Sequence, residues 1–300
     1  MKTIIIAGGS GFLGQVLENY FSSKGYKIKI LTRKPTKENH IYWDAKTLGD
    51  WTSLLEKTDG LINLTGKSVD CRYTIKNKKL IYDSRVESTG VLGNAINKCK
   101  NPPKVWFNSS TATIYRHSLD KKMTEATGEI GNDFSMNIAK SWEKAFNEIK
   151  NPKTRKIILR TSIALGKKGG ALIPLRNLTK FGLGGKQGLG NQKVSWIHEL
   201  EFARAVEFLL NDEKLNGIFN LSVPEPTDNK TLMKTLRKTM NISFGITHPI
   251  WLLKLGAFFI GTETELVLKS RNVIPERLLK NGFKFKFTDH KIALNDLIKS

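Results

Sequence analysis

The first two thirds of the chain alternate between short apolar runs and longer amphipathic stretches. The apolar runs are rich in β-branched and aromatic residues, as buried strands are, and the stretches between them repeat apolar residues at helical spacing. The expected strands are residues 3–7, 27–32, 41–43, 60–64, 105–108 and 156–160, and the expected helices are 16–21, 83–98 and 134–149. This alternation predicts an α/β fold with a doubly wound, mostly parallel sheet and helices on both of its faces.

The pattern changes after Leu165. Residues 166–190 are rich in glycine and lysine, and the chain beyond them looks mostly helical and irregular. The expected elements are helices at 172–181, 199–210 and 229–240, a strand at 217–221 and an apolar-alternating piece at 283–287. We therefore expect a larger part over residues 1–165 and a smaller, mostly helical part over 166–300, with the strand at 217–221 able to rejoin the main sheet.

A glycine-rich turn joins the first strand to the first helix, with glycines in the spacing G-x-x-G-x-x-G. The absence of side chains at Gly8 and Gly11 lets a pyrophosphate approach the backbone, and Gly14 lets the helix pack closely on the strand. The free N–H groups at the helix start attract phosphate. This arrangement predicts a dinucleotide site, and the alternative is a glycine-rich turn in another kind of α/β protein. The expected cofactor ligands are Gly8, Ser10, Gly11, Phe12, Leu13 and Gly14.

The end of the second expected strand indicates which dinucleotide binds. An acidic residue about twenty positions beyond such glycines binds the ribose 2′-hydroxyl of NAD, whereas an arginine accommodates the 2′-phosphate of NADP. Arg33 stands nineteen residues past Gly14, Lys34 follows it, and there is no acid between Thr32 and Pro35. A guanidinium can pair with phosphate in a two-pronged contact. We therefore expect NADP; the alternative is two surface cations in a lysine-rich chain.

The chain of 300 residues is strongly basic, with a formal net charge of +22. The basic residues are mostly lysines spread along the whole sequence, and runs such as Lys76-Asn77-Lys78-Lys79 lack neighbouring aromatic residues on which bases could stack. The charge therefore indicates a solvated surface that can steer anionic ligands, rather than nucleic-acid binding. The most apolar late stretch, residues 249–261, is too short to span a membrane and contains Lys254.

Cysteine and histidine usage adds little chemistry. Cys71 and Cys99 cannot form a disulfide framework, which fits a reduced, cytoplasmic setting. The expected first strand follows Met1-Lys2 directly, so we expect no signal peptide. The five histidines are scattered without ligand spacing, and we expect no metal site. We expect a monomer or homodimer that acts on a small molecule, with neither a nucleic acid nor a membrane as its partner.

Several short motifs carry a family resemblance through their order and spacing. They are Ala7–Gly14, Leu61–Gly66, Asp83–Thr89, Leu159–Gly166, Lys168–Leu172, Gly182–Gly185, Ser195–His198 and Val273–Leu279. Together they resemble the extended short-chain dehydrogenase/reductase (SDR) superfamily and, more narrowly, its atypical epimerase-like branch of the YfcH type, which ends in a small C-terminal segment. The resemblance implies an NADP-binding Rossmann domain over residues 1–165 and a substrate-binding part over 166–300. It also implies an oxidoreductase or epimerase that acts on a sugar-like or other carbonyl or hydroxyl substrate.

Further cofactor contacts are expected beyond the glycine turn. The backbone at the end of the fourth strand should pass close to the cofactor ribose and nicotinamide. Arg85, like Arg72, could meet an anionic substrate or the cofactor phosphates, and ordinary surface charge is the alternative for both. The expected ligands in this region are Asn63, Leu64, Thr65, Gly66, Arg85 and Ser109.

The catalytic residues of the superfamily are only partly present. A tyrosine usually serves as acid or base, with its pKa lowered by a lysine four residues later, and a serine or threonine binds the substrate oxygen. By resemblance, Thr111 takes the hydroxyl position. Where the tyrosine and lysine should begin a helix, this chain has Met136 and Lys140 or, in another register, Ser135 and Ala139.

The missing tyrosine leaves three interpretations open. In the first, another group serves as acid or base: Tyr115 is the first candidate, at the mouth of the same strand and loop, and Glu143 or a bound water is the next. A partly exposed loop aromatic is the alternative for Tyr115. In the second, the protein binds NADP without hydride transfer and acts as a redox or cofactor sensor. In the third, the pocket carries an unrelated chemistry.

Overall fold

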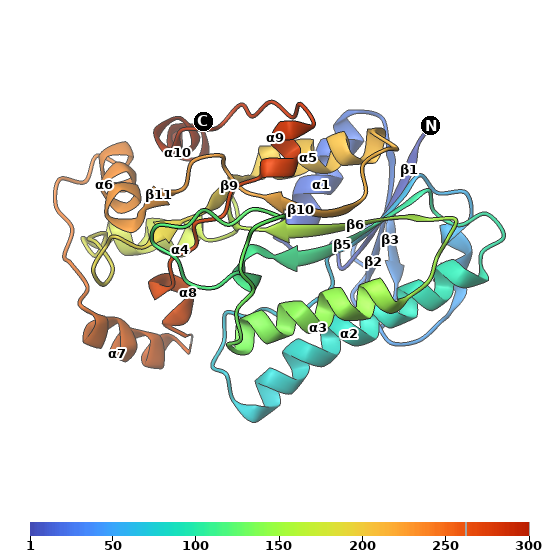
Figure 1. The fold of residues 1–300 in the computed structure, drawn as a ribbon, viewed down its shortest axis with the longest axis horizontal. Coiled ribbons are helices and arrows are strands. Elements are labelled where there is room, and N and C mark those ends of the chain that lie inside the picture. The colour runs from blue at the N-terminus through green and yellow to red at the C-terminus, as the bar shows by residue number, and fades with distance from the viewer. Residues whose placement is uncertain (262, 300) are drawn as a thin grey trace.

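The core of the protein is one parallel sheet, in a computed structural model that describes residues 1–261 and 263–299. Within these residues, seven strands join in the order β10-β6-β5-β4-β1-β2-β3 (Figure 1). They are β1 Thr3–Ala7, β2 Lys27–Thr32, β3 His40–Tyr42, β4 Gly60–Asn63, β5 Val105–Thr111, β6 Arg155–Thr161 and β10 Gly217–Leu221. All neighbouring strands run parallel, which confirms the expected sheet. The strand at 217–221 does rejoin it, and β5 extends past residue 108 to Thr111.

Helices cover both faces of this sheet (Figure 1). One face carries α1 Phe12–Ser23 and α5 Glu199–Asn211, and the other carries α2 Ile75–Lys98 and α3 Phe134–Glu148. Because successive side chains of a strand point to opposite faces, each strand feeds two cores. Ile4 and Ile6 lie in the core under α1 and α5, whereas Ile5 lies in the core under α2 and α3. Burying each such side chain contributes about 1.5–3 kcal/mol, which explains why these runs are apolar throughout.

Helix α2 begins at Ile75, well before the expected start at residue 83. The side chain of Thr74 caps it by accepting a hydrogen bond from the backbone N–H of Asn77 at 3.2 Å. The first residue, Ile75, is 91% exposed. Residues 75–80 bury no side chain, and Ile81 is the first buried apolar residue of the helix, so the periodicity that reveals the rest of the helix is absent from its first turns.

A smaller part lies beyond the carboxyl ends of the strands (Figure 1). In it β7 pairs with β9, β8 pairs with β11, and a separate apolar cluster joins α4, α6 and α10. The elements are β7 Ile163–Leu165, α4 Leu172–Lys180, β8 Lys193–Val194, β9 Trp196–His198, β11 Thr227–Asp228, α6 Asn229–Thr239, α7 Ile250–Ile260, α8 Glu265–Leu268 and α10 His290–Lys299. Helix α9, Glu276–Lys280, packs beside β10 instead. The short 3-10 turns are Asp50–Leu55 and Ala112–Ile114.

The apolar-alternating piece at 283–287 does not form a strand. Its aromatic rings pack between helices: Phe283 meets Phe208 of α5 edge-on at 5.4 Å between centroids, and Phe287 stacks on His198 at 3.9 Å. The segment therefore ties the chain end to α5, and its alternation reflects packing rather than sheet pairing.

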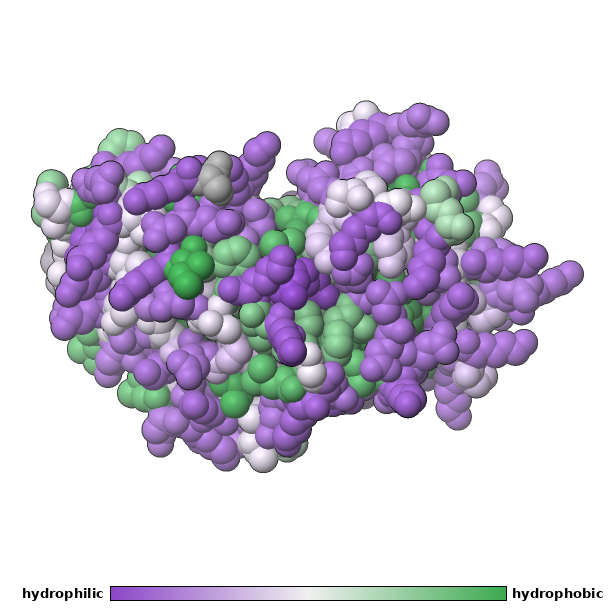
Figure 2. Space-filling model, turned by 90° about the horizontal axis from the view of Figure 1, so that it is seen from above, coloured by the Kyte–Doolittle hydropathy of each residue, from purple (hydrophilic) through white to green (hydrophobic). Residues whose placement is uncertain are grey.

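The surface in Figure 2 is mostly hydrophilic, with apolar patches between the charged side chains. This matches the dispersed lysines of the sequence. Among residues 1–261 and 263–299, no helix combines the length and the apolar character needed to cross a membrane.

Candidate functional site

The turn after β1 has the backbone that the glycines predict. Gly8 has φ +72°, in the left-handed region, and a Cβ there would lie 2.9 Å from backbone atoms of Thr65. A Cβ on Gly14 would lie 2.2 Å from the carbonyl oxygen of Gly9. Side chains at these two positions would push the turn away from the segment after β4 and the helix away from the turn. The turn is therefore fixed by close backbone contacts.

The start of α1 is open to an anion. Gly11 occupies the N-cap position in an extended conformation and offers no side-chain acceptor, and the first helical turn has no acidic residue. The first N–H groups of the helix therefore keep their positive end free for a ligand. Ser10 is exposed at the tip, where its Oγ accepts a hydrogen bond of 3.3 Å from Thr32 at the end of β2.

The ring of Phe12 has a packing role in the same turn. Gly166 and Gly169, in the loop after β7, leave no room for a side chain, because a Cβ on either would lie within 2.4 Å of that ring. The lack of side chains at these two glycines thus lets the loop after β7 pack against Phe12 in the glycine turn. Phe12 and Leu13 are the first residues of α1, so their backbone N–H groups lie at the helix start, and their role as cofactor ligands stays a prediction.

Arg33 follows β2 at the edge where the turn lies. It is exposed, directly after Thr32, and forms no ion pair or hydrogen bond with the residues the structure describes. The neighbouring residue Lys34 is exposed as well. Among the described residues, no carboxylate pairs with Arg33, so its charge would be available to a 2′-phosphate.

The segment after β4 combines a structural residue with a free polar group. Asn63 is fully buried: its Nδ2 donates to Asn108 at 2.8 Å and to Thr89 at 3.2 Å, and its Oδ1 accepts from the backbone N–H of Thr65. The side chain of Asn63 therefore positions the loop, and the expected approach of its backbone to the cofactor stays a prediction. The hydroxyl of Thr65 is buried without a partner in the described chain and lies beside Gly8.

Arg85 reaches this segment from α2. A Cβ on Gly66 would lie 3.0 Å from its guanidinium carbon, so the two groups are in close contact. The guanidinium donates only to backbone carbonyls, those of Lys67 and Ile81, both at 3.0 Å, and it lies 4.9 Å from the ring centroid of Trp142. Burial lowers its pKa to about 10. Arg85 is thus a cation next to the turn that has no carboxylate partner among the residues the structure describes.

At the carboxyl end of β5, Ser109 and Thr111 are partly exposed, whereas Ser110 is buried. Thr111 accepts a hydrogen bond of 3.1 Å from the backbone N–H of Thr113, which leaves its O–H free to donate. The expected position of Thr111 at the mouth of the sheet fits this geometry, and its catalytic role stays a prediction.

A buried network, formed by Arg160, Glu143, Tyr115, Ser110 and Asn220, lies just below that mouth. Arg160 donates to both carboxylate oxygens of Glu143, at 2.8 and 2.7 Å, and Ser110 donates to the same carboxylate at 2.6 Å. Burial alone would lower the pKa of Arg160, but the paired carboxylate outweighs it and the pKa is raised. Glu143, a second candidate for acid or base, is thereby held by three donors.

Tyr115 belongs to the same buried network. It is 0% exposed, its hydroxyl donates to Asn220 at 3.0 Å, and it accepts from Arg160 at 2.8 Å. Burial raises its pKa. The alternative of a partly exposed loop aromatic is therefore wrong. The catalytic role of Tyr115 stays a prediction, and this enclosed, fully bonded hydroxyl does not favour it.

The head of α3, where the superfamily tyrosine would stand, is met by a different phenol. The hydroxyl of Tyr73 lies 3.3 Å from Ser135 Oγ, and Ser135 also donates to Glu265 of α8. Burial raises the pKa of Tyr73 to about 12. The sequence gives no signal for Tyr73, because its contact with Ser135 joins residues 62 positions apart and no motif surrounds it.

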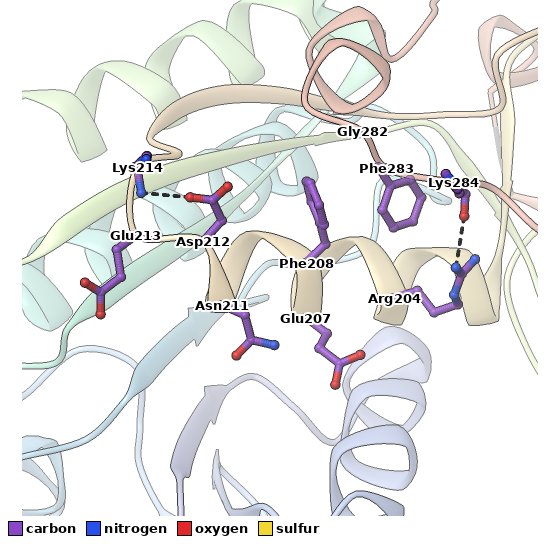
Figure 3. A pocket seen from close by; sticks show the side chains of 10 residues that line it. All are labelled: Arg204, Glu207, Phe208, Asn211, Asp212, Glu213, Lys214, Gly282, Phe283 and Lys284. Carbon is purple, nitrogen blue, oxygen red and sulfur yellow. Dashed lines mark hydrogen bonds between the residues drawn. The ribbon is translucent and has the colours of Figure 1, made fainter.

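A surface groove elsewhere on the molecule lacks these features. It lies between α5 and Gly282–Lys284, with Phe208 and Phe283 side by side in it (Figure 3). Residues 211–214 line it and lead from α5 toward the start of β10, at the amino ends of the strands. The glycine turn is at the opposite edge, so this groove is not the dinucleotide site.

The fold and the turn have counterparts in known proteins. The sequence profile of the NAD dependent epimerase/dehydratase family matches residues 4–222, and a domain of unknown function, DUF1731, matches residues 248–297. An epimerase family protein of Staphylococcus aureus is 33% identical over 305 residues and covers 100% of both chains. The chain belongs to the NAD dependent epimerase/dehydratase family.

Solved structures of this epimerase family share the fold. The crystal structure of the human epimerase family protein SDR39U1 with NADPH has a TM-score of 0.90, 27% identity and 99% coverage of both chains. A nucleoside-diphosphate sugar epimerase from Corynebacterium glutamicum has a TM-score of 0.80 and 26% identity, covering 98% of this chain and 57% of that one. The expected α/β Rossmann fold and the expected family are therefore confirmed.

Proposed function

We propose that this epimerase family protein binds NADP(H) and transfers hydride to or from a carbon that bears a carbonyl or hydroxyl oxygen. The observation that carries the proposal is the turn at Gly8–Gly14, which is closed to side chains and ends at an uncapped helix start. The buried, unpartnered hydroxyl of Thr65 beside Gly8 also fits a bound dinucleotide. The human relative, which was crystallised with NADPH, supports the choice of cofactor.

Several residues would hold the dinucleotide. The backbone from Ser10 to Leu13 would face the pyrophosphate, Arg33 the 2′-phosphate, and Arg85 and Thr65 the part that lies over the end of β4. When bound, the nicotinamide would supply or accept the hydride. Thr111, at the mouth of β5, would orient the substrate oxygen through its free O–H.

We assign the proton transfer to Tyr73 in preference to Tyr115. Tyr73 is partly exposed and meets Ser135 at the head of α3, whereas the hydroxyl of Tyr115 is enclosed and bonded on both sides. With a pKa of about 12, Tyr73 stays protonated near neutral pH and suits a proton donor to a forming alkoxide. This favours carbonyl reduction over alcohol oxidation.

A second function, a non-catalytic NADP sensor, is favoured by one observation. The helix position of the superfamily tyrosine holds Ser135 or Met136, and Met136 is only 4% exposed. A sensor would bind NADPH and leave it unoxidised. NADPH consumption with a panel of aldehydes, 2-oxo acids and nucleotide-linked keto sugars separates the two functions, because only the enzyme turns over with at least one class.

The cofactor choice is tested by changing Arg33. Arg33→Asp should lower the ratio of NADPH to NADH affinity by at least tenfold, because it replaces a charge-assisted phosphate contact with repulsion. Lys34→Asp, at the next exposed position, is the matched control and should change the ratio less. Fluorescence titration of both cofactors measures the ratio. A ratio left untouched in Arg33→Asp would remove the assignment of NADP.

The setting that we propose is a reduced cytoplasm, in which the protein acts as a monomer or homodimer on a small molecule. Both cysteines are free in the structure, at Cys71 and Cys99. The dispersed lysines serve as a solvated surface, and neither a nucleic acid nor a membrane is a partner in this proposal. Absence of salt-dependent DNA binding at low salt would agree with it.

A further inference from the structure

Arg271 lies where the smaller part meets the head of α3; it is partly exposed, its Nη1 is buried, and it has no ion-pair partner among the described residues. The backbone of Arg271 is fixed between two residues near β8: its N–H donates to the carbonyl of Lys193 at 2.7 Å, and its carbonyl accepts from the N–H of Ser195 at 3.0 Å. Its Nη1 is buried and has no hydrogen-bond partner in the described chain. Because burying a polar nitrogen without a hydrogen bond is unfavourable, this arrangement needs an explanation.

The acidic groups near Arg271 are bound to another cation. Asp133 and Glu265 both act on it electrostatically, yet neither is within ion-pair distance among the described residues. Lys269 holds both of them, with its Nζ 2.6 Å from Glu265 and in contact with Asp133. Burial therefore outweighs the two carboxylates and lowers the pKa of Arg271. The charge of Arg271 is left for a group outside the chain.

A second cation without a carboxylate partner among the described residues is Arg85 of α2. Tyr73 is within electrostatic reach of both guanidinium groups. Among the described residues, the guanidinium of Arg85 donates only to backbone carbonyls. It contacts Gly66, and the preceding residue, Thr65, contacts Gly8 of the glycine turn. Arg85 therefore approaches Tyr73 from the segment after β4, Arg271 belongs to the smaller part, and Tyr73 itself contacts Ser135 at the head of α3.

We propose that Arg271 and Arg85, with Tyr73, form a subsite for a compact oxyanion of the substrate, a carboxylate or a phosphate. This rests on the proposed function and narrows its substrate class from any carbonyl or hydroxyl compound to one that carries such an anion near the reacting carbon. Arg271 binds the anion, since its Nη1 has no other partner. Arg85 adds a second positive charge from the cofactor side, and Tyr73 faces the reacting oxygen.

The subsite is tested on the full chain saturated with NADPH, with malonate, inorganic phosphate and the neutral diamide malonamide as probes at constant ionic strength. At about ten times its dissociation constant, a bound anion should raise the melting temperature by roughly 2–5 °C. We expect this rise with malonate or with phosphate, and the larger of the two identifies the class of anion. Malonamide should give no rise.

Arg271→Leu should abolish the response to the anions and leave NADPH affinity within about twofold of wild type. Arg204→Leu is the matched control, because Arg204 pairs with Glu201 at 2.6 Å within the chain and should keep the response. Without any probe, Arg271→Leu should melt at or above the wild-type temperature, because it removes a cation whose Nη1 is buried without a hydrogen-bond partner.

Three results would overturn the subsite: an anion response that survives in Arg271→Leu, no response in the wild type, or anions that compete with NADPH. The last result would place the anion at the cofactor phosphates instead. If the wild-type protein did not bind NADPH at all, that result would instead contradict the proposed function itself.

Discussion

Two arginines close to α3 differ in what surrounds them: Arg160 is buried, whereas Arg271 is partly exposed with one buried nitrogen. Arg160 has its charge matched by Glu143 in a two-pronged pair, and its remaining donor reaches Tyr115. Arg271 has a buried Nη1 with no partner in the described chain, and Lys269 holds the nearest carboxylates. The guanidinium nitrogens of Arg160 therefore all have partners within the protein, whereas Nη1 of Arg271 has none among the described residues.

The difference separates structural chemistry from ligand chemistry. A closed pair such as Arg160 with Glu143 connects β6 to α3 and keeps the mouth of the sheet rigid. A cation without a counter-ion, such as Arg271, does not stabilise the ligand-free protein in this way, so we explain its presence by a ligand. The two phenols follow the same division, since Tyr115 belongs to the buried network and Tyr73 is within electrostatic reach of Arg271 and Arg85.

The largest effect on stability is expected from breaking the closed pair. Glu143→Leu leaves Arg160 buried without a counter-ion and should lower the free energy of unfolding by about 3–5 kcal/mol, measured by urea denaturation. The double variant Glu143→Leu, Arg160→Leu should recover much of this loss, because no lone charge remains. Equal losses in the single and double variants would show that the pair is not closed as described.

Removing the hydroxyl of Tyr73 should lower the rate of turnover, whereas removing that of Tyr115 should lower the stability of the fold. Tyr73→Phe should lower NADPH turnover by about 10²–10⁴-fold with the best carbonyl substrate of the panel, because a positioned proton donor is lost. Tyr115→Phe should instead lower the free energy of unfolding by about 1–3 kcal/mol, since it leaves buried polar partners unsatisfied. Steady-state rates at equal folded fraction and urea denaturation measure the two effects. A reversed outcome would return the catalytic role to Tyr115.

A smaller effect is expected from the titration of Tyr73. Its pKa in the folded protein is about 12, above the usual value of 10.0, so the unfolded chain loses this proton first as pH rises. Its contribution to stability is therefore fully present below pH 10 and is lost between pH 10 and 12. The stability difference between wild type and Tyr73→Phe should change across that window and stay constant below it. A difference that is constant up to pH 12 would place Tyr73 in an ordinary solvated environment.

Local patterns made the sheet and the turn predictable from sequence. The run Ile4-Ile5-Ile6 is apolar on both faces because both are covered, and the positions of Gly8 and Gly14 follow from close backbone contacts that exclude any side chain. The contacts themselves join distant residues, such as Gly8 and Thr65, but their traces in the sequence are short local patterns. The first turns of α2 were missed because residues 75–80 bury no side chain, so they leave no apolar period.

The site was less predictable because its contacts are distant in sequence. Tyr73 meets Ser135, and both meet Glu265, across stretches that no local pattern relates. The enclosure of Tyr115 depends on Asn220, 105 positions away, and so its exposure was misjudged. A missing partner, as at Arg271, has no signature in the sequence at all, because it becomes visible only when the surrounding groups are placed.

The most direct measurement of the account is the ligand-free stability of two matched variants, Arg160→Leu and Arg271→Leu, in urea. Arg160→Leu leaves the carboxylate of Glu143 buried and unpaired and should lower the free energy of unfolding by about 3–5 kcal/mol. Arg271→Leu should leave it unchanged or raise it. A comparable loss in both variants would show that Arg271 is a structural residue, and would contradict the assignment of its charge to a ligand.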